Sequence, residues 1–190
     1  MLEDKLISVA SNYFNDSELQ RIDSLSSNPH FDNLLTLDRE IGGIGIFNIN
    51  NGRTGRYHVE DRDILRPLQY IYMNLELREN SLSWFTRDII HMCGLHLESI
   101  IKRCTRKYRT PLGKSLYDKK LIKILDARII SELGVIAKLF NAAKHEVSSY
   151  KDEHLFSIKD ALYCYFITRK LASELYRHVE LYTSPEVWTD

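Results

Sequence analysis

The chain has 190 residues, of which 44% are hydrophobic and 27% are charged, a composition typical of one globular domain. Its 26 basic and 26 acidic residues balance, so the charge of the whole molecule does not argue for a nucleic-acid partner. No apolar run approaches the roughly 18 residues that a membrane helix needs, and the N-terminus lacks the basic and apolar stretches of a secretory signal. We therefore expect a single cytoplasmic domain over 1–190 that does not enter a membrane.

The three cysteines, Cys93, Cys104 and Cys164, are widely spaced and form no CxxC pair. An odd number of cysteines without this spacing argues against a disulfide framework and against a zinc site. We expect buried, reduced thiols, with neither a metal nor another cofactor.

Apolar residues recur at helical spacing through most of the chain, which predicts a mainly α fold. A first helix is expected over 1–14, and a second ends near residue 26 after a break at 15–17. Residues 27–62 are the least regular, with strand and turn character around 40–60 that predicts a small irregular or β-hairpin insertion. The N-terminal helices and this insertion therefore occupy 1–62.

The helical pattern is strongest over 63–181, which we expect to form a bundle core of about four long helices, followed by a tail over 182–190. One helix is predicted to end near residue 80 and the next to occupy 82–105. The apolar stripe of the second helix includes His96, which we expect to be a hydrogen-bonded core histidine.

A segment in the middle of the chain is strongly basic although the whole chain is neutral. From Lys102 to Lys123 it holds nine basic residues and a single acid, Asp118. Such a patch can hold phosphate groups. The residues that we predict to contact nucleic acid are Lys102, Arg103, Arg106, Lys107 and Arg109. A partner surface and solvated connector charge explain the same pattern.

The next helix has two chemically different sides. Its apolar stripe consists of Ile129, Leu133, Ile136, Phe140, Ala143 and Val147. At about 100° per residue, Lys138, Asn141 and His145 cluster on a face outside this stripe. The polar face can be a functional site or simply a solvated surface, and the helix dipole by itself favours a histidine near a helix C-terminus.

A final helix is expected to begin at Ser157, because Ser157 and Asp160 have the spacing of a capping box. Residues 161–167 are apolar or aromatic on all sides of this helix. Such an element is buried between the core and a second surface, which could be a partner subunit.

The stretch from Leu139 to Val147, with the capped helix after it, resembles the signature region of HEPN-domain proteins, a family of small helical bundles that includes metal-independent RNases. The family motif is an Arg, four to six further residues and a His, often with a polar residue directly after the Arg. His145 and Asn141 match the His and the polar residue. Phe140 occupies the Arg place of the shortest motif, whereas Lys138 has six residues between it and His145.

The resemblance implies an antiparallel HEPN-like bundle that forms a homodimer and brings two motifs together. It implies that His145 transfers a proton during attack of an RNA 2′-OH, while Asn141 positions a phosphate or the His ring and Lys138 opposes the developing charge. A protein of this kind would belong to a prokaryotic defence or toxin–antitoxin system and would have an antitoxin-like partner protein.

Two other functions remain open, since a fold alone does not define an activity. One is a non-catalytic HEPN-like module that binds RNA, a nucleotide or a partner protein. The other is a structural helical interaction protein.

Two further expectations concern the surroundings of the polar face. Arg87, His91 and Glu98 share one face of the helix over 82–105, where we expect a surface salt-bridge network. The basic segment precedes the helix that carries His145 near its other end, so helix rise alone would separate them by about 25 to 30 Å in one protomer.

Overall fold

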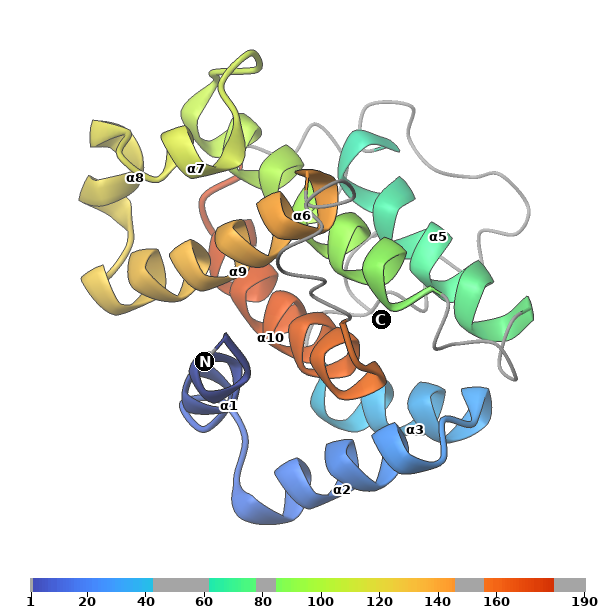
Figure 1. Cartoon of the computed structure of the whole chain (residues 1–190). Helices are drawn as coiled ribbons and strands as arrows, with labels where there is room; N and C mark the ends of the chain where they lie inside the picture. The colour runs from blue at the N-terminus through green and yellow to red at the C-terminus, as the bar shows by residue number, and fades with distance from the viewer. Residues whose placement is uncertain (1, 43–61, 78–84, 146–155, 180–190) are drawn as a thin grey trace.

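A computed structural model describes residues 2–42, 62–77, 85–145 and 156–179. These residues form nine helices joined by turns, with no strand among them, which confirms the mainly α class (Figure 1). The predicted β-hairpin falls largely on 43–61, outside the described residues, as does the predicted tail over 182–190. Among the described helices, none combines the length and the apolar character needed to cross a membrane.

The N-terminal part consists of the helices α1 (Leu2–Ala10), α2 (Asp16–Ser27) and α3 (Phe31–Ile41). A capping box starts α2: the Asn15 side chain accepts a hydrogen bond from the Glu18 backbone N–H (3.0 Å), and the Glu18 carboxylate accepts one from the Asn15 backbone N–H (2.8 Å). The break predicted after the first helix is therefore confirmed.

Helix α3 corrects the expectation of an irregular segment beginning at residue 27. Leu34, Leu37 and Ile41 are buried and have the three- and four-residue spacing of an amphipathic helix. Asp38 lies on the same buried side at 1% exposure, where a charged residue obscures the apolar pattern. Its charge is matched by a residue far away in the sequence.

The buried Asp38 carboxylate is paired with Arg169. The Nε and Nη2 atoms of Arg169 donate to the two carboxylate oxygens at 3.1 and 3.3 Å. Both side chains are almost completely buried, at 2% and 0% exposure. A buried pair of this kind is strongly disrupted when one partner is lost, because the other charge remains unsolvated. The Asp38–Arg169 pair therefore fixes α3 against the last described helix, α10 (Ile158–Tyr176).

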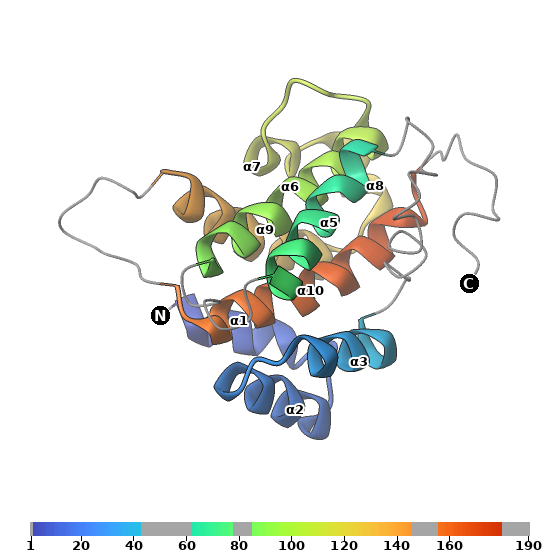
Figure 2. The ribbon, with the colours of Figure 1, turned by 90° about the vertical axis from the view of Figure 1, so that its right-hand side faces the viewer.

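The core is built around α6 (Thr86–Thr105), which packs against α5 (Arg62–Leu77), α9 (Ala127–His145) and α10 (Ile158–Tyr176). Figures 1 and 2 show α6 between α5 and α9, with α10 crossing beneath them. Two short helices, α7 (Leu112–Ser115) and α8 (Lys119–Ile124), connect α6 to α9. Most buried apolar side chains belong to α5, α6, α9 and α10.

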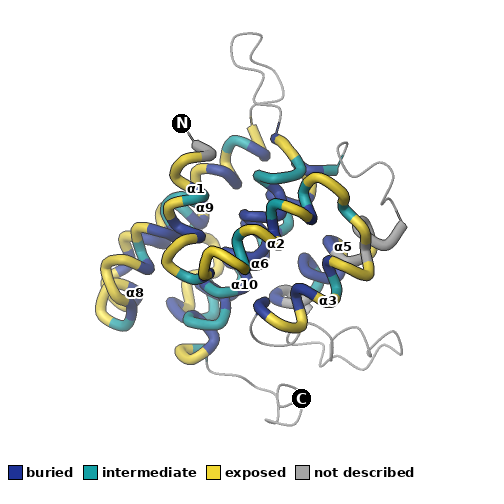
Figure 3. Tube along the Cα trace, turned by 90° about the horizontal axis from the view of Figure 1, so that it is seen from below, coloured by how far each residue is buried: buried dark blue, intermediate teal, exposed yellow. Residues whose placement is uncertain are grey.

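Helix α10 begins as predicted at a capping box, in which the Ser157 hydroxyl accepts from the Asp160 backbone N–H (3.0 Å) and the Asp160 carboxylate accepts from the Ser157 backbone N–H (2.8 Å). All residues over 161–169 are buried. Helices α1 and α2 of the same chain pack against α10 on the side opposite α6 (Figures 2 and 3). The chain itself therefore provides the second surface that the sequence left open to a partner subunit.

Two predictions about core residues are confirmed. Cys93, Cys104 and Cys164 are all buried thiols. The Nδ1 atom of His96 lies 2.7 Å from the carbonyl oxygen of Ile64, so this ring nitrogen carries the proton and donates it. The histidine thereby links α6 to α5 inside the core.

Candidate functional site

Helix α9 presents the polar face that the sequence indicated. Its apolar residues Ile129, Leu133, Ile136, Phe140 and Ala143 are buried, and Val147 lies outside the described residues. Lys138, Asn141 and His145 are all exposed. They span about 10 Å along the helix axis, because each residue adds about 1.5 Å. This spacing is short enough for one stretch of a polyanionic ligand to contact all three.

The Arg place of the family motif is a core position in this chain. Phe140 is 3% exposed and packs against Gly94 of α6, where an added Cβ would lie only 2.2 Å from the Phe140 Cδ2 atom. The His91 ring stacks on Phe140 with a centroid distance of 5.3 Å and an interplanar angle of 23°. Phe140 therefore holds α6 and α9 together and offers nothing to a phosphate.

Arg87 has a role that the sequence did not indicate. Its Nε atom donates to the carbonyl oxygen of Ala143 at 2.8 Å, and its Nη2 atom donates to that of Ala142 at 3.3 Å. These carbonyls belong to the last turn of α9, which has no further helical N–H groups to bind them. A cation at this end of a helix is also favoured by the helix dipole. Arg87 thus secures the turn that carries His145.

The expected network of Arg87, His91 and Glu98 is replaced by contacts to α7 and α9 and by a Glu98–Lys102 pair within α6. His91 stacks on Phe140, and burial together with the nearby Lys144 ammonium lowers the pKa of His91. Glu98 pairs with Lys102 and accepts a hydrogen bond from the Leu112 backbone N–H at 3.1 Å. The sequence correctly places the three residues on one face, but α7 and α9 pack along that face.

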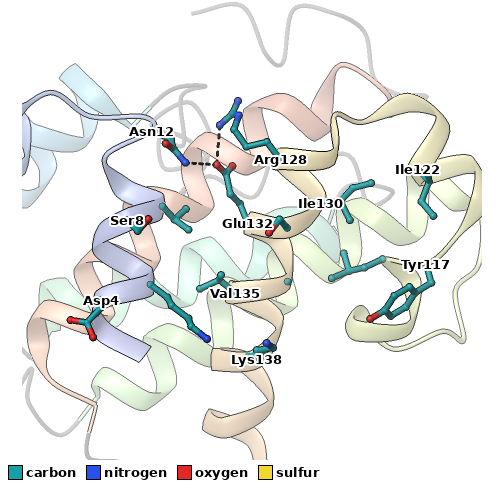
Figure 4. A pocket seen from close by; sticks show the side chains of 15 residues that line it. Asp4, Ser8, Asn12, Tyr117, Ile122, Arg128, Ile130, Glu132, Val135 and Lys138 are labelled. Carbon is teal, nitrogen blue, oxygen red and sulfur yellow. Dashed lines mark hydrogen bonds and ion pairs between the residues drawn. The ribbon is translucent and has the colours of Figure 1, made fainter. Parts of the chain in front are cut away.

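A groove with a volume of about 880 Å³ lies between α1, the α7–α8 region and α9. Of the three residues of the polar face, Lys138 lines it, whereas Asn141 and His145 are not among its lining residues. Lys138 lines this groove together with Lys5 and Asp4 of α1. Figure 4 shows α9 between the α1 side chains on one side and Tyr117 and Ile122 on the other. The groove has an apolar part formed by Val9, Leu116, Tyr117, Ile122, Ile130 and Val135.

The lining of the groove includes one buried carboxylate whose hydrogen bonds are made within the protein. Glu132 is 3% exposed and accepts hydrogen bonds from Asn12 Nδ2 (2.8 Å) and Arg128 Nη1 (2.9 Å), and it also accepts one from the Tyr13 hydroxyl. Burial and the Glu132 carboxylate raise the pKa of Tyr13, so its hydroxyl keeps its proton. This cluster ties the turn after α1 to α9, and the Arg128 guanidinium offsets the negative charge of Glu132. Of these contacts, only the Arg128–Glu132 pair could be predicted from the sequence, because the two residues are four positions apart in one helix.

The basic segment folds into α7 and α8 and the loops around them. Lys107 pairs with Asp118, and the Lys107 ammonium and the Lys120 backbone N–H hold the pKa of Asp118 below its usual value. Lys102 pairs with Glu98, and Arg103 is half-buried. Arg106, Lys107 and Arg109 are exposed. Lys102 and Lys107, two of the predicted nucleic-acid contacts, therefore make ion pairs within the chain.

Part of the basic segment lies next to the polar face of α9. Tyr117 of the connector and Lys138 of α9 line the same groove. An added Cβ on Gly113 of α7 would lie 3.9 Å from Asn141 Nδ2. The connector lies back along α9 because Leu112, Leu116 and Leu121 are buried. Helix rise alone did not take account of this packing, which brings α7 next to Asn141.

The fold and the groove define a mainly helical protein with a basic region beside a partly apolar groove and an exposed polar helix face. Comparison of the chain with known protein families, with curated proteins and with solved structures gives no match. Within the described residues, no group of three or more His, Cys, Asp or Glu side chains could hold a metal ion.

Proposed function

We propose that the chain is a HEPN-like helical bundle that binds RNA along the groove and the polar face of α9 and cleaves it without a metal. The observation that supports the proposal is the groove, because the connector residue Tyr117 and Lys138 of α9 both line it. Exposure of Lys138, Asn141 and His145 on one face supports it further. We place the protein in a prokaryotic defence or toxin–antitoxin system, acting as a homodimer.

In this proposal His145 accepts the proton of a ribose 2′-OH as the 2′ oxygen attacks the adjacent phosphorus. The phosphorus–O5′ bond breaks, which leaves a 2′,3′-cyclic phosphate, and the departing 5′ oxygen takes a proton from water. Lys138 opposes the negative charge that builds up on the phosphate oxygens, and Asn141 orients the phosphate by hydrogen bonding. Arg87 acts only as a positioning residue, since its hydrogen bonds go to the end of α9.

The test is cleavage of mixed single-stranded and structured RNA by the purified protein in EDTA. We expect His145→Ala to reduce cleavage by about 100-fold or more, the usual effect of losing a general base. His178→Ala is the matched control, because His178 is also exposed but follows α10. Equal cleavage by wild type and His145→Ala would contradict the assigned role of His145.

A non-catalytic HEPN-like module is the second candidate, and the burial of Phe140 in the Arg place favours it. The same experiment separates the two functions when RNA binding is measured in parallel. RNA that is bound but not cleaved by the wild-type protein supports the binding module. Absence of both binding and cleavage supports a structural interaction protein.

A further inference from the structure

The basic segment contains two unusually exposed aromatic side chains. Tyr108 is 58% exposed and Tyr117 is 82% exposed. Large aromatic rings usually lose much of their surface to water when a protein folds, and rings left exposed are enriched at binding sites. Neither ring has been assigned a role in the core or at the polar face.

An ion pair brings these two tyrosines into the same region. Tyr108 directly follows Lys107 and Tyr117 directly precedes Asp118, and the Lys107 ammonium is paired with the Asp118 carboxylate. The two rings are therefore carried by chain segments that meet at this pair. The pair also neutralises the only acid between Lys102 and Lys123.

The surface around the two tyrosines carries several cationic side chains. The exposed basic residues that follow Tyr108 are Arg109, Lys114, Lys119, Lys120 and Lys123. Alternation of cations with exposed aromatic rings is typical of surfaces that bind single-stranded nucleic acid, where phosphates contact the cations and bases stack on the rings. A duplex hides the faces of its bases inside its own stack and cannot use such rings in this way.

Tyr117 also lies where a bound strand could continue toward the polar face. It lines the groove together with Ile122 and Lys138 (Figure 4). A nucleotide stacked on Tyr117 would thus direct the neighbouring phosphate toward α9.

We propose that Tyr108 and Tyr117 form a stacking platform for unpaired bases, so that the ligand of the groove is a single-stranded nucleic acid. This inference rests on the proposed function and narrows its substrate class. It assigns binding energy to two aromatic rings that lie outside the family-like motif on α9.

The experiment measures binding of a 12-nucleotide 2′-O-methyl oligouridine and of a 12-base-pair duplex of 2′-O-methyl RNA at low salt. The methyl group removes the 2′-OH nucleophile, so cleavage cannot interfere. We expect the wild type to prefer the single strand and Tyr117→Ala to weaken that binding by about 5- to 100-fold, with a similar loss for Tyr108→Ala. Tyr117→Phe should bind almost as well as wild type, because the ring is retained.

Tyr70→Ala is the matched control, because Tyr70 is 46% exposed on α5 but lies beside Arg66 and outside the basic segment. It should leave binding unchanged. Lys119→Ala should instead lower the affinity for both ligands. It should also reduce the slope of log affinity against log salt concentration by about one, the value for one lost phosphate contact. Thermal melting of each variant should be close to that of wild type, because the replaced side chains are exposed.

Three results would overturn the inference. Equal affinity of wild type for single strand and duplex would show that unpaired bases are not recognised. Unchanged binding by both alanine variants would remove the tyrosines from the site while leaving RNA binding intact. Failure of wild type to bind either ligand would overturn the proposed function as well as this inference.

Discussion

At the scale of single residues, two helix glycines in similar local structure should respond to alanine in opposite ways. Gly94 of α6 faces Phe140, and an added Cβ would lie 2.2 Å from Cδ2 of that ring. We expect Gly94→Ala to lower the free energy of unfolding by about 1–3 kcal/mol, because the tightly packed ring cannot move away freely. At Gly134 of α9 nothing lies within 4 Å of the added Cβ atom. Gly134→Ala should therefore raise the free energy of unfolding by up to about 1 kcal/mol.

Urea unfolding measured side by side for both variants and wild type checks this prediction. Each variant is the control for the other, since both changes add one methyl group inside a helix. A stabilised Gly94→Ala protein would mean that α6 and α9 do not pack as closely as described.

At the scale of elements, the end of α9 depends on Arg87 of α6. Arg87→Ala removes the donors to the Ala142 and Ala143 carbonyls, so we expect the free energy of unfolding to fall by about 1–2 kcal/mol. Amide hydrogen exchange should quicken in the last turn of α9. Arg177→Ala is the control: its exposed pair with Glu174 contributes less than about 1 kcal/mol. Unchanged exchange in Arg87→Ala would show that other contacts hold this turn.

At the scale of the whole molecule, stability should fall in mild acid because of His96. Burial and the nearby Arg169 charge lower the pKa of His96 to about 3, although its bond to Ile64 acts in the opposite direction. The unfolded chain takes up a proton near pH 6.5, whereas the folded chain does not until about pH 3, so stability declines as the pH falls between these values. This histidine alone should reduce the free energy of unfolding by about 2 kcal/mol between pH 7 and pH 5.

Urea unfolding at several pH values checks the acid prediction. His96→Asn should remove this contribution. The free energy of unfolding of the variant should therefore change less between pH 5 and pH 7 than that of wild type, even if the variant is less stable at pH 7. His178→Ala leaves the buried histidine in place and should retain the wild-type slope. Identical slopes for wild type and the Asn variant would contradict a buried neutral His96.

Much of the helical framework could be predicted from periodicity and capping. Asn15 and Ser157 begin helices with local hydrogen bonds, which nearby residues determine. The buried stripe of α9 follows from its spacing alone. Helix α3 was missed because Asp38 breaks its apolar pattern, and only the distant Arg169 makes the burial of that charge acceptable.

The candidate site was predictable only in part. Exposure of Lys138, Asn141 and His145 followed from helical geometry. The use of Arg87 as a helix cap could not be foreseen, because the acceptor carbonyls lie more than fifty residues away in the sequence. The RNase activity remains a prediction that the cleavage experiment tests, and the homodimer remains a prediction as well.

By itself, the sequence determined most of the segments that become helices, α3 excepted, and which side of those helices is apolar, since both depend mainly on interactions within a few residues. Only the tertiary structure decided what covers those sides. The N-terminal helices cover α10, and the connector lies along α9 so that Tyr117 and Lys138 line one groove. The physical reason is that burial of apolar surface is non-directional, so a local pattern shows that a face is buried but does not specify its partner.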